Sequence, residues 1–111
     1  MLQLPKPVAN YFEAENAHDL AKALACFDKD AIVLDTGEDL EMKGIAAIQK
    51  WKETVTAKYK LHIEPLDASV HGQNVEVLTE VSGSFDGSPI KFNYKFKLKN
   101  DLIVYLSSEP K

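Results

Sequence analysis

Residues 90–99 read IKFNYKFKLK, and this stretch decides the fold. An apolar or aromatic side chain alternates with a lysine or asparagine at every step, which is the period of two expected for a strand with one face in the core and one in water. We therefore expect Ile90–Lys99 to be a strand of an antiparallel sheet. Phe92, Tyr94 and Phe96 belong to its inward face.

The period of two continues on both sides of this stretch. The apolar positions of the preceding residues 61–70 change parity near Pro65, which predicts a strand with a bulge. Asp86-Gly87 is typical of a two-residue hairpin, and Asn100-Asp101 turns the chain into a last strand. We expect a four-stranded meander, with strands at residues 61–70, 75 onward, 90–99 and 102–108.

Helical spacing replaces this period near the N-terminus. Pro5 and Pro7 suit the start of a helix, because their missing N–H groups would be unpaired there. Asp19 is placed to cap a second helix. In the first helix, the residues at helical spacing are Val8, Tyr11, Phe12 and Glu15. The apolar stripe of the second helix is Leu20, Ala23, Leu24 and Phe27.

A strand pair and a third helix separate these helices from the meander. Residues 31–35 predict a buried strand, residues 36–39 a turn and residues 40–43 a short strand. Gly44 begins a helix whose stripe of Ile45, Ile48, Trp51, Val55 and Tyr59 faces the core, while Lys50, Lys52, Glu53 and Lys58 mostly face away. The order of elements predicts an α+β fold, and we expect a single domain over residues 1–111.

Composition excludes several classes of function. Thirteen lysines, with no arginine, against seventeen Asp and Glu give a net charge of −4, so we expect no nucleic-acid partner. No stretch approaches the roughly eighteen apolar residues of a membrane span, and the N-terminus lacks the apolar core of a signal peptide, so we expect no membrane partner. The single cysteine, Cys26, fits a reducing cytoplasm.

Asp35 is the first candidate for chemistry. It ends an apolar strand and shares parity with Val33, so it faces the core if Val33 does. A carboxylate in apolar surroundings is suited to act as a general base. The alternative is a solvated Asp that initiates the turn at Thr36-Gly37, and the residues alone favour that interpretation because turn Asp residues are common.

Aromatic side chains are the second set of candidates. The Tyr94 hydroxyl would serve either a ligand or a neighbouring carbonyl, since a buried tyrosine needs a hydrogen-bond partner. His62 and Glu64 alternate on one strand and form a candidate polar pair of uncertain facing. The three histidines and one cysteine lack the spacing of a metal site, so we expect no metal.

The helix pair, the segment Asp30–Asp35, the helix start Gly44–Ile48 and the meander together resemble the nuclear transport factor 2-like superfamily, from about Val8 to Ser108. The resemblance is closest to its ketosteroid isomerase and SnoaL-like polyketide cyclase branch, where a D-A-x-V-x-D segment precedes a Gly-x-x-A-I helix start. It implies a cone-shaped, curved antiparallel sheet wrapped around three helices. The superfamily contains both enzymes and non-catalytic binders, so the fold alone does not decide the function.

The resemblance also implies roles for individual residues. Asp35 falls where ketosteroid isomerases carry the base that removes a proton next to a carbonyl, and Tyr11 falls where they carry a tyrosine that donates to the oxyanion. Tyr94 stands near the place of their second donor, a protonated aspartate, and this departure distinguishes the chain from the steroid isomerases. With the resemblance, the pocket interpretation of Asp35 becomes at least as good as the turn interpretation.

Two function hypotheses follow. The first is an isomerase or a lyase or cyclase without a cofactor, acting on a small apolar carbonyl or polyketide-like molecule with Asp35 as base and Tyr11 and Tyr94 as donors. The second is a non-catalytic module that binds an apolar ligand or another protein in the same cone. The expected ligand-binding walls are Phe12, Phe27, Val33, Trp51, Tyr59, Phe92 and Phe96.

We also expect a homodimer. A meander has an outer face that its own helices cannot cover, and members of the resembled superfamily commonly pair through it. The apolar residues expected on that face are Leu78, Ile103 and Tyr105.

Overall fold

The computed structural model describes residues 3–36 and 39–111, apart from the side chains of residues 55–59. Along this part of the chain the helices are α1 (Lys6–Asn16), α2 (Leu20–Ala25) and α3 (Ile45–Tyr59). The strands are β1 (Phe27–Asp35), β2 (Leu40–Lys43), β3 (His62–His71), β4 (Asn74–Ser82), β5 (Ile90–Lys99) and β6 (Leu102–Pro110). The predicted α+β fold is confirmed.

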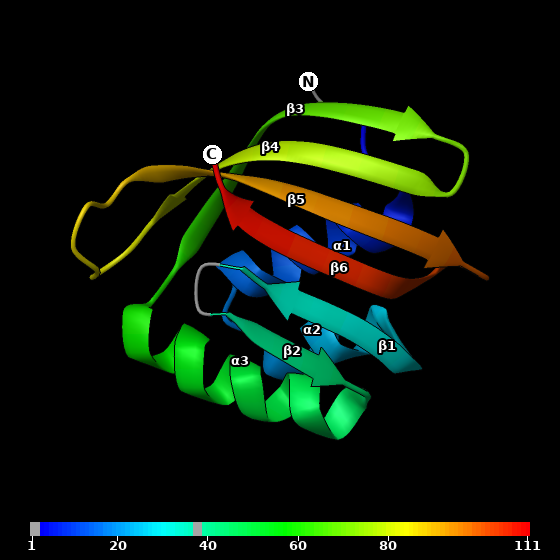
Figure 1. Ribbon diagram of the computed structural model, residues 1–111, viewed down its shortest axis with the longest axis horizontal. Helices are drawn as coiled ribbons and strands as arrows, with labels where there is room; N and C mark the ends of the chain where they lie inside the picture. The colour runs from blue at the N-terminus through cyan, green and yellow to red at the C-terminus, as the bar shows by residue number, and fades with distance from the viewer. Residues whose placement is uncertain (1–2, 37–38) are drawn as a thin grey trace.

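One curved sheet carries all of these strands, in the order β2-β1-β6-β5-β4-β3. The meander from β3 to β6 is antiparallel, and β1 joins it by pairing in parallel with β6. Figure 1 looks onto the outer face of the sheet, with α1 and α2 behind it and α3 along the β1–β2 side. The helices therefore cover one face only.

The core lies between the helices and the concave face of the sheet. Val75, Val77, Thr79 and Val81 of β4 are buried on this face, as their alternation predicts. Tyr94 and Phe96 of β5 are buried beside them, and the bulge expected near Pro65 is present as a register shift between Pro65 and Asp67. The period of two thus placed the meander correctly.

A side chain at the end of α1 fixes that helix to the sheet. Asn16 donates from Nδ2 to the carbonyl of Ile63 at 2.8 Å and accepts from the Ile63 N–H at 2.7 Å. The side chain thus occupies both hydrogen-bonding groups of one β3 residue, as a neighbouring strand would. This contact sets the distance and rotation of the last turn of α1, which carries Glu15.

Three local predictions were wrong. Phe27 begins β1 instead of ending α2, because α2 stops at Ala25 and Phe27 pairs with Ile103 of β6. Asp86-Gly87 lies within a longer connection over residues 83–89, because Pro89 has no N–H to continue the ladder and pairing with β4 resumes at Ile90.

The third error concerns Ile103, which was expected on the outer face and is fully buried. Tyr105 pairs with Lys97 while Ile103 pairs with Leu98, so β6 contains one extra residue at this point. Such a bulge reverses the facing of the residues that precede it. Both Ile103 and Leu106 therefore face the core.

Phe96→Ala should lower the free energy of unfolding by about 3–5 kcal/mol, because it removes a buried ring and leaves a cavity. Phe96 is 2% exposed, and its ring centroid lies 5.9 Å from that of Tyr11 and 5.7 Å from that of Phe12. Leu66→Ala is the control, since Leu66 is 42% exposed and should change stability by less than about 0.5 kcal/mol. Equal losses in urea denaturation of the two variants would contradict this placement of the core.

Candidate functional site

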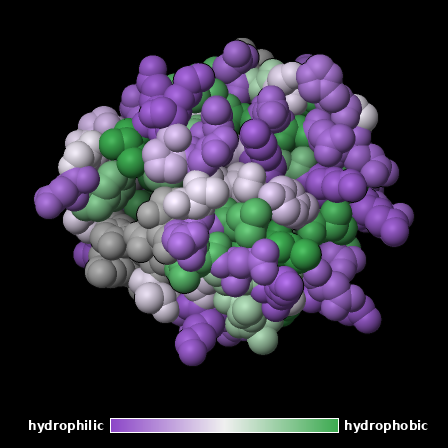
Figure 2. Space-filling model, viewed as in Figure 1, coloured by the Kyte–Doolittle hydropathy of each residue, from purple (hydrophilic) through white to green (hydrophobic). Residues whose placement is uncertain are grey.

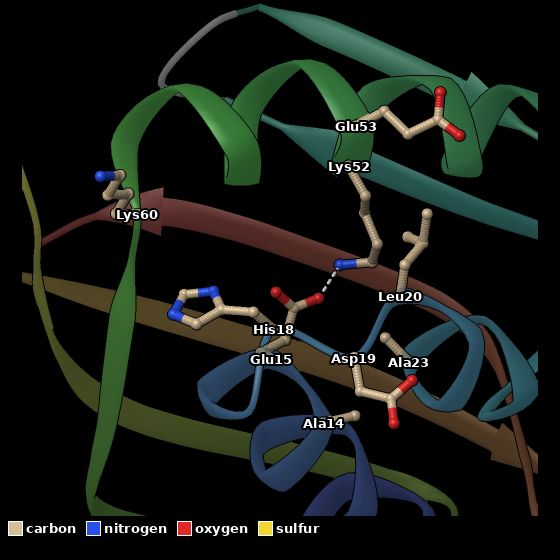
Figure 3. Close-up of a pocket in the computed structure, with 9 residues that line it drawn as sticks. All are labelled: Ala14, Glu15, His18, Asp19, Leu20, Ala23, Lys52, Glu53 and Lys60. Atoms are coloured by element: carbon tan, nitrogen blue, oxygen red, sulfur yellow. Dashed lines mark hydrogen bonds and ion pairs between the residues drawn. The ribbon is translucent and has the colours of Figure 1, made fainter.

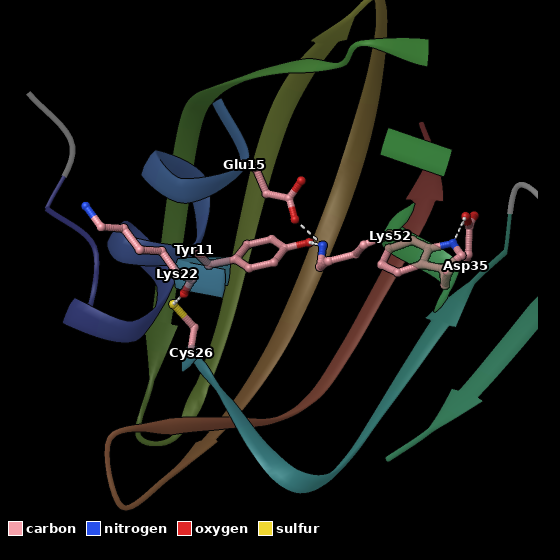
Figure 4. Close-up of polar contacts among 7 residues, drawn as sticks. Tyr11, Glu15, Lys22, Cys26, Asp35 and Lys52 are labelled. Carbon is pink, nitrogen blue, oxygen red and sulfur yellow. Dashed lines mark hydrogen bonds and ion pairs between the residues drawn. The ribbon is translucent and has the colours of Figure 1, made fainter. Parts of the chain in front are cut away.

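A buried lysine lies between α1 and α3. Lys52 Nζ donates to Tyr11 Oη at 2.7 Å and forms an ion pair with Glu15 Oε1. Tyr11 and Glu15 are four residues apart on α1, so they project from the same side of that helix. Lys52 is 3% exposed and Glu15 6%, so both side chains are buried. Figure 4 shows Glu15 and Tyr11 beside the Lys52 amine.

Lys52 was predicted to face away from the core, and that prediction was wrong. It stands four residues after Ile48, which puts it on the buried face of α3. The apolar pattern of the helix carried this signal, because positions 45, 48, 52, 55 and 59 form one helical stripe interrupted only by Lys52. A lysine at a stripe position, with Glu15 at a stripe position of α1, would have predicted the pair.

Aromatic rings surround the ammonium group. Lys52 Nζ lies 4.5 Å from the ring centroid of Tyr11 and 4.7 Å from that of Trp51. Phe27 is more distant, at 5.9 Å. These ring faces favour a cation, so they replace part of the hydration that Lys52 loses.

Burial shifts the protonation equilibria of this cluster. Burial lowers the pKa of Lys52, and the negative charge of Glu15 opposes that effect. Burial, followed by the charge of Glu15, holds the pKa of Tyr11 well above its usual value. The pKa of Tyr94 is also raised, first by burial and then by the charges of Glu15 and Asp35. Tyr94 therefore lies within electrostatic reach of both carboxylates.

Asp35 occupies the last position of β1 and is 7% exposed. Its Oδ2 accepts a hydrogen bond from Trp51 Nε1 at 3.2 Å. The expected parity with Val33 is present, since both side chains are buried. Gly37 and Glu38, whose amides would hold a turn Asp, lie outside the described residues. The burial fits the pocket interpretation, and the role of Asp35 as a base stays a prediction.

The predicted ligand-binding residues lie around this interior. Phe12, Phe27 and Phe96 are buried core residues, and their rings pack edge to face with Tyr11 or with each other. Tyr94 lies against Phe12 and Phe96. Val33 is fully buried, Trp51 and Phe92 are partly buried, and the Tyr59 side chain lies outside the described residues.

A pocket of about 560 Å³ opens between α1, α2 and α3 (Figure 3). None of the six predicted wall residues whose side chains the structure describes is among its described lining residues. Glu15 and Lys52 belong to its lining and point toward one another across the gap between α1 and α3. Its other lining residues are Ala14, His18, Asp19, Leu20, Ala23, Glu53 and Lys60.

Three further observations concern the described residues. Within residues 3–36 and 39–111, no group of three or more His, Cys, Asp or Glu side chains is arranged to hold a metal ion. His62 Nε2 lies 3.7 Å from Glu64 Oε2, and both side chains are exposed, away from the interior. No helix in this part of the chain is both long and apolar enough to cross a membrane.

The cone of sheet and helices defines the class of protein as nuclear transport factor 2-like. A solved structure with a ketosteroid isomerase-like fold from Catenulispora acidiphila, in complex with trimethylamine, superposes with a TM-score of 0.87 at 18% identity, covering 96% of this chain and 86% of that one. RV0760c from Mycobacterium tuberculosis, in complex with estradiol-17beta-hemisuccinate, has a TM-score of 0.82 at 17% identity, with 96% and 93% covered.

The chain belongs to the SnoaL-like domain family, whose sequence profile matches residues 8–106. A putative polyketide cyclase from Sinorhizobium meliloti, protein SMa1630, is 33% identical and has a TM-score of 0.90, with 96% of this chain and 95% of that one covered. No protein of curated function is detectably similar in sequence. The resemblance to the SnoaL-like and ketosteroid isomerase branch is thereby confirmed.

Tyr94→Phe should reduce the loss of stability that the protein suffers at alkaline pH. A raised pKa keeps the folded-state phenol protonated, so above about pH 10 the unfolded chain loses this proton first and unfolding becomes more favourable. Urea unfolding of the wild type and Tyr94→Phe between about pH 8 and pH 11 measures the difference. The free energies of unfolding of the two proteins should change in parallel with pH up to about pH 9. Above that pH the free energy of unfolding of the wild type should fall faster, so the two values converge. Parallel curves throughout would contradict the shift.

Proposed function

We propose that this protein is a small-molecule enzyme of the SnoaL-like, ketosteroid isomerase-like type. It moves a proton on an apolar carbonyl or polyketide-like substrate, as an isomerase or a lyase or cyclase. The observation that carries the proposal is the burial of the Asp35 carboxylate in the interior that also holds the hydroxyls of Tyr11 and Tyr94. The similarity to a putative polyketide cyclase supports the substrate class.

Asp35 is the proposed base. The Trp51 indole N–H donates a hydrogen bond to one carboxylate oxygen, which helps to orient the group. Removing a proton next to a carbonyl places negative charge on the carbonyl oxygen, and fixed donors in a dry site stabilise that charge better than water does.

Tyr94 and Tyr11 are the proposed donors. Their raised pKa values keep both phenols protonated at neutral pH, as donors must be. The negative charge of Asp35 contributes to the raised pKa of Tyr94, which supports a shared substrate site for the two groups. The proposed walls are Phe12, Phe27, Val33, Trp51, Tyr59, Phe92 and Phe96.

A non-catalytic ligand carrier on the same fold is the second candidate. The edge-to-face packing of Tyr11, Phe12, Phe27 and Phe96 favours it, because these rings fill interior space with one another. A carrier of this kind would be stabilised by its ligand without any proton exchange. The experiment below separates the two candidates.

Asp35→Asn should abolish proton exchange while preserving the fold, because an amide cannot accept the substrate proton and is easier to bury than a carboxylate. The assay incubates a panel of apolar ketones with the protein in D₂O and follows deuterium incorporation next to the carbonyl by NMR, so no substrate need be known beforehand. Asp30→Asn is the matched control, since Asp30 is an exposed carboxylate of the same strand.

Exchange that is catalysed by the wild type and by Asp30→Asn but lost in Asp35→Asn supports the enzyme. Equal exchange by Asp35→Asn removes Asp35 as the base. Thermal stabilisation by a ketone without catalysed exchange in the wild type favours the carrier.

We also propose that the protein works in the cytoplasm. Cys26 is a free, buried thiol, and free thiols persist in a reducing compartment.

A homodimer through the outer face of the sheet is the last part of this proposal. Ile32 of β1 pairs with Tyr105 of β6, and Leu34 lies two residues along β1 on the same face. Figure 2 shows hydrophobic residues gathered in the middle of this face with hydrophilic residues around them. Leu78 of β4 is half-buried on the same face.

Light scattering should give twice the monomer mass of 12.4 kDa for the wild type and the monomer mass for Tyr105→Lys, because a charge at the centre of an apolar interface would be desolvated. Lys99→Glu, at the end of β5, is the control and should remain dimeric. A monomeric wild type at working concentrations would contradict the dimer.

A further inference from the structure

The pocket between α1, α2 and α3 contains an amine at its wall. Lys52 and Glu15 both line this pocket, whose volume of about 560 Å³ is in the usual range for small-molecule sites. The apolar side chains of Ala14, Leu20 and Ala23 form another part of the lining. A small molecule with an apolar body that enters this pocket therefore lies beside the Lys52 and Glu15 side chains.

Lys52 differs from the other lysines of the described part of the chain. Every other lysine whose side chain the structure describes is exposed. Lys52 is buried, and burial lowers its pKa, so its proton is easier to remove than that of a solvated lysine. The neutral amine is the nucleophilic form, and desolvation is one of the ways in which proteins obtain it.

The proton has an acceptor in place. Glu15 Oε1 is in direct contact with Nζ, so the proton can pass from the ammonium to the carboxylate within an existing hydrogen bond. The product is a neutral amine beside a neutral carboxylic acid. In a buried site this transfer removes two charges that would otherwise need solvation.

We propose that Lys52 is a carbonyl-capturing amine, which condenses with a small aldehyde or ketone entering the pocket between α1, α2 and α3 to form an imine. This activity goes beyond the proton transfer proposed for Asp35 and does not depend on it. The ligand class is a small carbonyl compound with an apolar body.

Imine formation at Lys52 needs no proton donor or acceptor besides Lys52 and Glu15. After Glu15 has taken the proton, the nitrogen lone pair forms a bond to the carbonyl carbon, and the carbonyl oxygen receives a proton from that nitrogen to give a carbinolamine. Glu15 then returns its proton to the hydroxyl, the C–O bond breaks, and water leaves as the C=N bond forms. The products are a protonated imine, the Glu15 carboxylate and one water, with no change of oxidation state.

The surroundings fit both stages of this reaction. Tyr11 Oη lies 2.7 Å from Nζ, where its hydroxyl can donate to the carbinolamine oxygen. The ring faces of Tyr11 and Trp51 near Nζ stabilise a cation, and the protonated imine is a cation at the same position. The Glu15 carboxylate then pairs with the protonated imine as it does with the ammonium.

Reductive trapping tests this proposal. The full-length protein is incubated near neutral pH with benzaldehyde and cyanoborohydride, which converts an imine into a stable benzylamine, and peptide mass spectrometry gives the extent of labelling at each lysine. Lys52 should be labelled roughly tenfold or more faster than Lys50, an exposed lysine of the same helix. This comparison is made within one folded wild-type sample, so it needs no variant.

Two variants sharpen the test. Glu15→Gln should slow labelling at Lys52 by roughly tenfold or more, because the amide cannot protonate the carbinolamine hydroxyl as water leaves. Lys50→Met is the matched control and should leave labelling at Lys52 unchanged. Labelling of Lys52 no faster than that of Lys50 in the wild type would overturn the proposal, and so would an undiminished rate in a folded Glu15→Gln.

Discussion

Burying the ammonium of Lys52 would be prohibitive without a partner of opposite charge, and this requirement constrains much of the interior. The desolvation penalty of an ion is several kcal/mol even after a protein relaxes around it. Glu15 supplies the opposite charge, Tyr11 supplies a hydrogen-bond acceptor, and two ring faces lie within 5 Å of the nitrogen. Removing any one of these groups leaves the remaining charge poorly compensated.

The same pair joins two elements that are far apart in the sequence. Glu15 belongs to the last turn of α1 and Lys52 to the middle of α3, and Asn16 ties that turn of α1 to β3. The position of α3 over the β1–β2 side is therefore linked to the opposite edge of the sheet. An apolar contact would tolerate sliding of the helices, whereas an ion pair with a short hydrogen bond specifies their register. The pocket between α1, α2 and α3 is lined by both residues of the ion pair, so its shape depends on that pair.

Much of the fold could be predicted from alternation, because β4 and much of β5 have one buried face and one exposed face. Residues 94–99 of β5 and the buried valines of β4 follow that pattern. The pattern failed where the backbone inserts an extra residue, as in β6 before Tyr105, since a bulge reverses the facing and leaves no mark in hydropathy. It also failed at Phe27, where an apolar residue suits either a helix end or a strand start.

The site was harder to predict than the fold, because sequence patterns class residues by polarity before contacts are known. Asp35 and the aromatic residues emerged from their parity and from the family resemblance, and Asp35 is buried. Lys52 was assigned to the surface because lysines seldom occupy a core stripe. Its neighbour Trp51 was placed on the stripe, and the structure gives the two adjacent residues separate partners, Asp35 and Glu15.

This arrangement gives the two buried carboxylates different chemistry. Protonating Glu15 destroys an ion pair with Lys52, so its proton must come from Lys52 itself or be compensated by another cation. Asp35 accepts a hydrogen bond from the indole of Trp51, which is a neutral donor. One helix, α3, thus supplies both the amine that pairs with Glu15 and the indole that donates to Asp35. In the two proposals, Asp35 exchanges a proton with a substrate, and Glu15 exchanges one with Lys52. The two proposed activities therefore rely on different carboxylates for proton transfer.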